Sequence, residues 1–238
     1  MAGRTILVIV PHPDDAELSC DASVARWIRE GDRAVLAVAT GGSLGAKLSS
    51  EPERMVEERA AEQLAAARVI GYEDVLFLGF RDGELEDDAA LRKALVREIR
   101  RIRPDLVILL DPLTVIYRNS YVNHRDHRML GMAALDAMYP EASNAGYFPD
   151  ALGDGLELHK VPEVLLATTD SPNYWVDVGD TLDLRFDALR QHASQLRLWP
   201  ENGEGVIREQ RELAAVIGRE HGMEYAEAFR RVVVNPLS

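Results

Sequence analysis

The chain has a single cysteine, Cys20, among its 238 residues, so it cannot form an internal disulfide. This fits a reducing compartment, and we expect a cytoplasmic protein. No stretch approaches the roughly 20 consecutive apolar residues that span a bilayer. The first residues also lack the long apolar segment and the small-residue cleavage site of a signal peptide. The sequence therefore predicts no membrane span.

Basic residues are scarce as well, with 27 lysines and arginines against 40 aspartates and glutamates, which gives a net charge of −13. Such a chain repels phosphate backbones and anionic membranes, so we expect no nucleic-acid partner. The excess carboxylates otherwise keep a protein soluble. Because 47% of the residues are hydrophobic, the chain can bury one sizeable core, and we expect a single domain over residues 1–238.

Segments with strand and helix patterns alternate along the chain. Continuous apolar or β-branched runs predict strands at 5–10, 34–39, 74–78, 106–110, 164–167, 174–178 and 229–234. Apolar residues at helical spacing predict helices at 16–30, 53–70, 89–102, 127–138, 182–198 and 206–220, and residues 141–155 have the composition of a loop. Four consecutive strand–helix units predict an α/β, Rossmann-like fold: a mostly parallel sheet with helices on both faces.

Polar clusters follow the predicted strands at their carboxyl ends, which is where open parallel sheets bind ligands. Residues 12–15 (His-Pro-Asp-Asp) follow the first strand, and residues 123–127 (Asn-His-Arg-Asp-His) come after the fourth. Asp82 and Asp111 lie at the same predicted edge, as ligand-supporting carboxylates or as turn residues. We expect the two clusters to converge into one site.

The first cluster places an imidazole and two carboxylates within four residues. Two carboxylates this close, Asp14 and Asp15, repel each other and raise one pKa unless a cation lies between them. The flanking prolines stiffen the turn. The alternative is a polar turn in which Asp15 caps the next helix.

The second cluster has the pattern of a helix start, with Asn123 as the expected N-cap and Asp126 at the third helical position. His124 and His127 are then three residues apart on the first turn, although a charged surface helix would have the same pattern. Together the clusters supply a His/Asp/His set, and three protein ligands with an open fourth position are typical of a catalytic zinc site. Imidazole and carboxylate also suit Fe²⁺, Co²⁺ or Mn²⁺.

These clusters resemble the PIG-L/LmbE family of zinc-dependent de-N-acetylases. The family hallmark is a His-Pro-Asp-Asp motif after the first strand and a later His-Pro-Asp-His motif. The first is intact at residues 12–15, and the second is His-Arg-Asp-His at residues 124–127. Arg125 replaces the usual proline, and the three functional positions of the motif, His124, Asp126 and His127, are retained.

Further motifs extend the resemblance over nearly the whole chain. Residues 59–62 (Arg-Ala-Ala-Glu) resemble the family's Arg-x-x-Glu helix, residues 191–195 its His-x-Ser-Gln stretch, and residues 225–229 its Tyr-Ala-Glu-x-Phe. Ser43 falls near a position where the family often has glutamate, and we assign it no role.

The resemblance implies that His12, Asp15 and His127 bind zinc and that Asp14 is the general base that takes the proton of the attacking water. It also implies that the catalytic site holds a small-molecule substrate, an N-acetylated amino sugar or its conjugate. N-acetylglucosamine-type compounds are the expected class, and residues 41–50 and 119–122 are expected to face the sugar. A homo-oligomer is compatible with the resemblance.

Three further residues receive roles from the resemblance. His124 is expected to stabilise the oxyanion or to protonate the leaving amine, with Asp126 orienting it. Arg59 is expected to reach the acyl group, although the same residue would also suit the solvated face of a charged helix. His192 lines the pocket or lies in the core.

Two other functions are compatible with parts of the pattern. An aspartate-rich magnesium site, as in phosphatase-like or receiver-like α/β domains, also places acidic pairs after the first strand but uses oxygen ligands. A non-catalytic sugar-binding module would keep the fold with a vestigial site, although the expected base and ligands are all present here.

Overall fold

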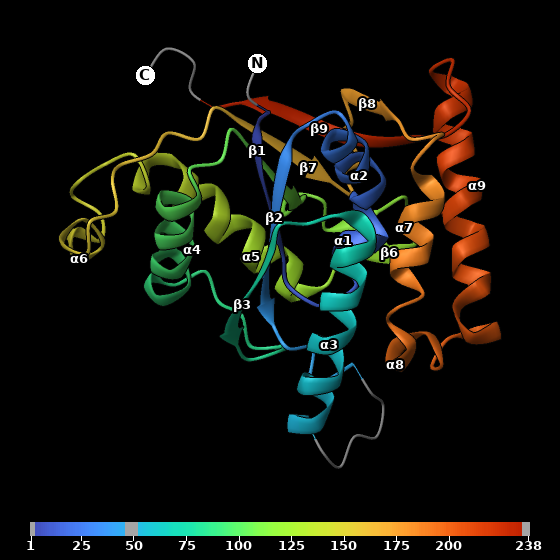
Figure 1. Cartoon of the computed structure of the whole chain (residues 1–238), viewed down its shortest axis with the longest axis horizontal. Helices are drawn as coiled ribbons and strands as arrows, with labels where there is room; N and C mark the ends of the chain where they lie inside the picture. The colour runs from blue at the N-terminus through green and yellow to red at the C-terminus, as the bar shows by residue number, and fades with distance from the viewer. Residues whose placement is uncertain (1–2, 46–51, 235–238) are drawn as a thin grey trace.

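A seven-stranded sheet lies at the centre of the computed structural model, which describes residues 3–45 and 52–234 (Figure 1). The strands of this sheet are β1 (Thr5–Val10), β2 (Arg33–Thr40), β3 (Asp74–Phe80), β4 (Leu106–Leu110), β7 (Glu163–Ala167), β8 (Tyr174–Asp177) and β9 (Ala226–Val233). Their order is β3-β2-β1-β4-β7-β9-β8; β9 runs antiparallel to both β7 and β8, and the other adjacent pairs are parallel. The predicted mostly parallel α/β sheet is confirmed.

Helices cover both faces of this sheet, as the alternating units predicted (Figure 1). They are α1 (Asp15–Ser19), α2 (Asp21–Arg29), α3 (Pro52–Ile70), α4 (Ala89–Ile102), α5 (Arg125–Asp136), α6 (Pro149–Gly153), α7 (Leu182–Leu189), α8 (Ala193–Leu196) and α9 (Glu204–Glu220). A π-helical segment (Ala137–Glu141), a 3-10 turn (Pro200–Gly203) and a hairpin of β5 (Ile116–Tyr117) and β6 (Tyr121–Val122) complete the elements.

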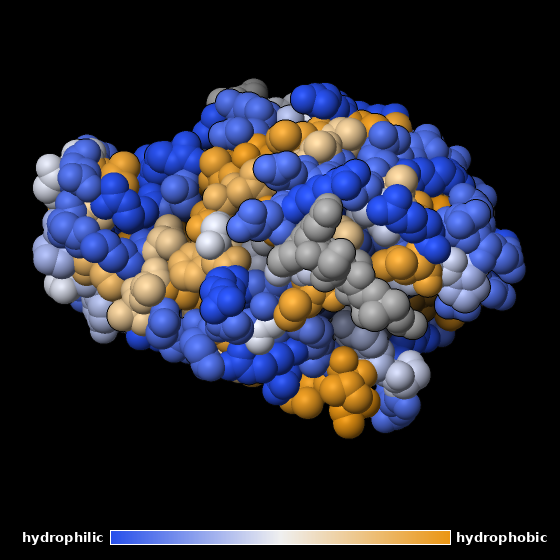
Figure 2. Space-filling model, turned by 90° about the horizontal axis from the view of Figure 1, so that it is seen from below, coloured by the Kyte–Doolittle hydropathy of each residue, from blue (hydrophilic) through white to orange (hydrophobic). Residues whose placement is uncertain are grey.

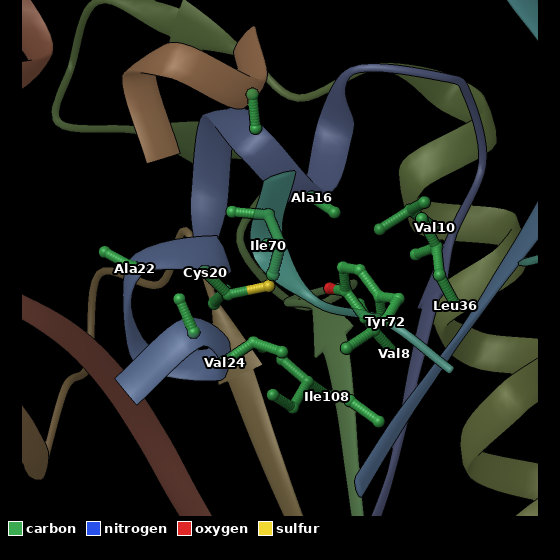
Figure 3. Packing of buried hydrophobic residues seen from close by; sticks show 14 of the residues in the cluster. Val8, Val10, Ala16, Cys20, Ala22, Val24, Leu36, Ile70, Tyr72 and Ile108 are labelled. Carbon is green, nitrogen blue, oxygen red and sulfur yellow. The ribbon is translucent and has the colours of Figure 1, made fainter. Parts of the chain in front are cut away.

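Side chains of β1 alternate between two hydrophobic cores because successive residues of a strand point to opposite faces. Ile6 and Val8 pack with α2, α3 and α7, whereas Leu7 and Ile9 pack with α4 and α5. Figure 3 shows the first core, in which Val8 and other strand residues meet Cys20 and side chains of the helices. Burying each large apolar side chain contributes about 1.5–3 kcal/mol, so the two cores fix the sheet from both sides.

The helix predicted at 16–30 is two helices, because Cys20 between α1 and α2 has φ −146° and ψ −4°, which is not helical. Glu227 of β9 accepts the backbone N–H groups of Ala22 and Ser23 at 3.3 and 2.8 Å. A carboxylate from a distant strand therefore caps α2. The helix predicted at 182–198 is likewise interrupted between α7 and α8, where Glu62 accepts the backbone N–H of Ser194 at 2.7 Å.

The segment predicted as a loop at 141–155 contains the short helix α6 and wraps around Arg100, a residue of α4 that is only 1% exposed. The Arg100 guanidinium donates to the backbone oxygens of Glu141, Ala142, Asn144, Tyr147 and Phe148. Burial lowers the pKa of Arg100. This buried cation orders a segment whose local composition predicted only a loop.

None of the described helices is long and apolar enough to cross a bilayer. Hydrophobic residues on the face seen in Figure 2 form separate patches among hydrophilic ones. Large exposed apolar side chains include those of Leu44, Leu113, Ile116 and Val122.

Candidate metal centre

The His-Pro-Asp-Asp turn leaves the carboxyl end of β1 and leads directly into α1, which begins at Asp15. Asp14 has φ 95° and ψ −18°, in the left-handed region that non-glycine residues rarely occupy. Its backbone N–H donates to Gln63 Oε1 at 3.1 Å. Such strained backbone persists where surrounding contacts hold it, and it is frequent at functional sites.

Three imidazoles meet at this edge of the sheet, as the two sequence clusters predicted. The ring centroids of His12, His124 and His127 lie 5.0 to 5.5 Å apart, and one nitrogen from each lies within 4.8 Å of the others. Asp15 lies between two of them, with Oδ2 at 3.1 Å from His12 Nδ1 and Oδ1 at 3.3 Å from His127 Nε2. The fold therefore brings the predicted ligand set together from two segments more than 100 residues apart.

Two further carboxylates contact His12. Its Nε2 lies 3.1 Å from Asp82 Oδ1 and 3.3 Å from Asp126 Oδ2. Asp82 also accepts the backbone N–H of Leu44 at 2.7 Å, and Asp126 accepts that of Gly83 at 2.7 Å. The sequence placed Asp82 at this edge without a definite role, and the structure puts it in contact with a predicted ligand.

The expectation that Asp126 orients His124 is wrong in its geometry, because the Asp126 carboxylate accepts from Gly83 and faces His12. The backbone N–H of Asp126 donates instead to His124 Nδ1 at 3.2 Å. His124, not Asn123, is the N-cap of α5. The predicted cap was displaced by one residue because Asn123 has other partners.

Asn123 orients a predicted metal ligand, which the sequence reasoning missed. Its Nδ2 donates to the backbone oxygens of Asp111 and Thr114, and its Oδ1 lies 3.0 Å from His127 Nδ1. With this oxygen as acceptor, Nδ1 carries the proton and Nε2 keeps a lone pair for a metal. The sequence signal for this contact was the spacing of four residues between Asn123 and His127 at the start of a helix.

Arg59 is buried, at 3% exposure, so the alternative of a solvated helix face is wrong for it. Its guanidinium donates to the backbone oxygens of Gly42 and Pro13, at 2.8 and 2.5 Å, and to Asp14 Oδ2 at 3.1 Å. Burial raises the pKa of Asp14 to about 6, while the Arg59 charge opposes this rise. Arg59 thus ties the first cluster to the loop after β2.

His192 is fully buried and lies 3.4 Å from Glu17 Oε1, so it belongs to the core rather than to an open pocket. Gln63 donates to the same Glu17 oxygen at 2.7 Å. Because Gln63 also accepts the N–H of Asp14, a buried polar chain leads from His192 to the first cluster. Ser43 lies in the described part of the loop after β2. Residues 46–50 of the predicted sugar-facing segment lie outside the described residues.

The charge balance of this donor set fits a divalent cation. Burial alone would lower the pKa of His12. Hydrogen bonds with Asp126, Asp15 and Asp82 outweigh this effect and raise the pKa to about 12. Burial favours neutral Asp15, but His127 and His12 hold its pKa well below the usual range. Buried Asp126 Oδ1 has no hydrogen-bond partner among the described residues. Clustered imidazoles and carboxylates of this kind suit zinc and related metals.

Two of the metal-centre residues, Asp15 and His127, line a cavity of about 610 Å³. Residues of the β5–β6 hairpin and of α9 line the same cavity. Ligand-binding pockets commonly have volumes of roughly 300–1,000 Å³. The cavity therefore has the size and the position of a substrate pocket.

The fold and this site define an α/β protein with a His/Asp metal-binding centre at the carboxyl edge of its sheet. A sequence model of the family described as PIG-L, GlcNAc-PI de-N-acetylase, matches residues 7–138. The chain belongs to the PIG-L family, as the two motifs indicated.

Relatives of known name agree with this membership. Diacetylchitobiose deacetylase of Thermococcus kodakarensis is 30% identical over 232 residues, which cover 96% of this chain and 83% of the relative. The structure of N,N'-diacetylchitobiose deacetylase from Pyrococcus horikoshii, in complex with an inhibitor, has a TM-score of 0.87 at 27% identity and covers 99% of this chain and 88% of that one. The chain is accordingly an enzyme that hydrolyses amide C–N bonds.

The same fold also occurs in a protein with a different activity. The 4-carboxy-2-hydroxymuconate hydratase of Pseudomonas putida KT2440 has a TM-score of 0.78 at 20% identity, with 99% of this chain and 98% of that chain covered. At this identity the likeness concerns the fold alone.

Proposed function

We propose that the chain is a zinc-dependent hydrolase that removes the N-acetyl group from an N-acetylglucosamine-type sugar or its conjugate. The observation that carries this proposal is the convergence of His12, His127 and Asp15 beside a substrate-sized cavity. The names of the relatives support the amino-sugar class.

His12, Asp15 and His127 would hold the metal, with Fe²⁺, Co²⁺ and Mn²⁺ as the alternatives to zinc. A zinc ion at this place supplies Lewis-acid polarisation of the amide carbonyl and lowers the pKa of water toward ~7. Asn123 supports this arrangement because its Oδ1, 3.0 Å from His127 Nδ1, leaves Nε2 free to ligate.

Asp14 would act as the general base that takes the proton of the attacking water. Its carboxylate is adjacent to a ligand but is bound by Arg59 at 3.1 Å rather than by the imidazoles. Gln63 holds its backbone N–H at 3.1 Å. We therefore assign Arg59 to the positioning of Asp14, in place of direct contact with the acyl group.

His124 would stabilise the developing oxyanion or donate a proton to the leaving amine. Its Nδ1 accepts the backbone N–H of Asp126 at 3.2 Å, so the neutral ring carries its proton on Nε2. A fixed N–H of this kind stabilises negative charge on a tetrahedral centre. Asp126 contributes through its backbone, whereas its carboxylate supports His12.

Acetate release from N-acetylglucosamine and its conjugates tests the proposal. Treatment with a zinc-selective chelator should abolish turnover, and zinc or cobalt should restore it. If magnesium alone restored activity, the oxygen-ligand alternative would replace the zinc site. If no acetate were released by the metal-loaded protein, the sugar deacetylase function would be rejected.

The variant Asp14→Asn should retain bound zinc and lose at least about 100-fold in kcat, in line with general-base catalysis. His12→Ala should lose zinc as well as activity. Asp187→Asn is the matched control, because its side chain is 60% exposed in a surface ion pair with Arg190. Full activity of the Asp14→Asn protein would remove this residue as the base.

A cytoplasmic location and a homo-oligomer stay predictions, as does a single domain over residues 1–238. Cys20 is free and buried, which is consistent with the expected reducing compartment.

A further inference from the structure

Two chemically different groups of side chains line the cavity beside the metal centre. One group is polar and consists of Asp15, His127 and Ser120, with the phenols of Tyr117 and Tyr121 from the β5–β6 hairpin. An amino sugar with its acetamido group at the metal would place its hydroxyls among these polar groups. The second group of lining side chains comes from α9.

Apolar side chains of α9 form one wall of the cavity. Val206, Leu213 and Ile217 all line the cavity, and their spacing of seven and four residues places them on one face of the helix. They are only partly buried, and neither described core cluster includes them. Leu18 and Trp199 continue the wall on the side of the core. This face of α9 is therefore directed into the cavity and not into the protein interior.

Two of the charged groups near this wall, Arg185 and Glu227, already have partners, whereas Glu209 of α9 also lines the cavity and is exposed. Arg185 donates to the backbone oxygens of Glu17 and Leu18 at 2.5 and 2.7 Å and to Gln210 at 2.9 Å. It also forms an ion pair with Glu227 at 3.1 Å. Hydroxyls of a second sugar ring that lay against Val206, Leu213 and Ile217 would meet aliphatic carbon, and a polar group buried without a partner is unfavourable.

We propose that the α9 wall binds an apolar aglycone, so that the preferred substrates are N-acetylglucosaminides that carry an alkyl or aryl group. This inference rests on the proposed deacetylase function. It follows from two observations: the wall lines the same cavity as Asp15 and His127, and the side chains of Val206, Leu213 and Ile217 present an apolar face to that cavity.

Steady-state acetate release from the methyl and hexyl glycosides of N-acetylglucosamine and from N,N'-diacetylchitobiose tests this inference on the zinc-loaded enzyme. The KM of the hexyl glycoside should be at least about tenfold below that of the methyl glycoside, with a similar kcat, because several methylenes leave water. Equal KM values for the two glycosides, or a lower KM for diacetylchitobiose than for the hexyl glycoside, would overturn it.

Variants of α9 locate the effect. Ile217→Asn should remove most of the advantage of the hexyl over the methyl glycoside. Val216→Asn is the matched control, because it makes the same change one residue along, on a side chain that does not line the cavity. If Ile217→Asn fails to fold, Leu213→Ala provides a milder test with the same expected loss. A hexyl advantage that persists in the folded variants would reject α9 as the binding wall.

The two proposals fail in different ways. If no glycoside releases acetate, the deacetylase function is rejected and this inference with it. If the methyl glycoside is deacetylated but the hexyl glycoside has no advantage, only the apolar subsite is rejected.

Discussion

The buried ion pair between Arg185 and Glu227 offers a sharp test of what holds the site-bearing turn in place. The side chains of Arg185 and Glu227 are 4% and 3% exposed, and their charged atoms are 3.1 Å apart. Glu227 also accepts two backbone N–H groups in the first turn of α2, from Ala22 and Ser23. Arg185 donates to the backbone oxygens of α1. One pair therefore joins β9, α7 and the two helices that follow the His-Pro-Asp-Asp turn.

The substitution Glu227→Leu leaves a buried guanidinium without its counter-charge and two N–H groups without their acceptor. Removal of one partner of a buried pair costs about 3–5 kcal/mol. For a protein of about 150–250 residues each kcal/mol lowers the melting temperature by roughly 2–4 °C, so we expect a fall of about 6–20 °C. Equilibrium unfolding in urea, followed by circular dichroism, measures the free-energy change directly.

The control is Glu58→Leu, because Glu58 pairs with Arg197 at 3.1 Å on the surface, with side chains 39% and 56% exposed. Exposed pairs contribute about 0–1 kcal/mol. The double variant with Arg185→Leu should recover part of the loss, since it removes the uncompensated charge. If Glu227→Leu cost no more than Glu58→Leu, the argument that this network stabilises the turn would be refuted.

Two further predictions concern the buried polar groups behind the site. Gln63→Leu removes the acceptor of the Asp14 N–H and the donor to Glu17, so kcat should fall and unfolding should become easier by about 1–3 kcal/mol. An unchanged kcat in steady-state assays would contradict the positioning of Asp14. Burial and the charge of Glu17 raise the pKa of Asp21 well above its usual value. The folded state then keeps a proton that the unfolded state releases, so stability should fall as the pH rises above about 4. Asp21→Asn should reduce this slope and keep the contact with Tyr72; identical slopes in melting curves from pH 4 to 8 would contradict it.

Much of the fold was predictable because its signals are local. The apolar run at Thr5–Val10 is buried on both sides in the structure, and such runs form the centres of parallel sheets. The convergence of residues 12–15 and 124–127 was also predictable, since parallel strands bring their carboxyl ends to one edge.

The incorrect predictions share a physical cause, which is competition from distant partners. Just after the helix break at Cys20, Glu227, about 200 residues away, accepts backbone N–H groups of α2, and no local pattern shows that contact. Asn123 is a good N-cap in isolation, but its amide binds the chain after β4 and the ring of His127 instead. Arg59 has the sequence context of a surface helix, yet it is buried against Asp14.

The strand and helix order and the two ligand-bearing motifs can be read from the amino-acid sequence, because they depend on periodicity and on residue type over a few neighbouring positions. The groups that contact each ligand are known only from the folded chain. Folding turned the Asp126 carboxylate toward His12, buried His192 and directed one face of α9 into the cavity. These contacts depend on side-chain directions and on elements that meet only after the chain has folded.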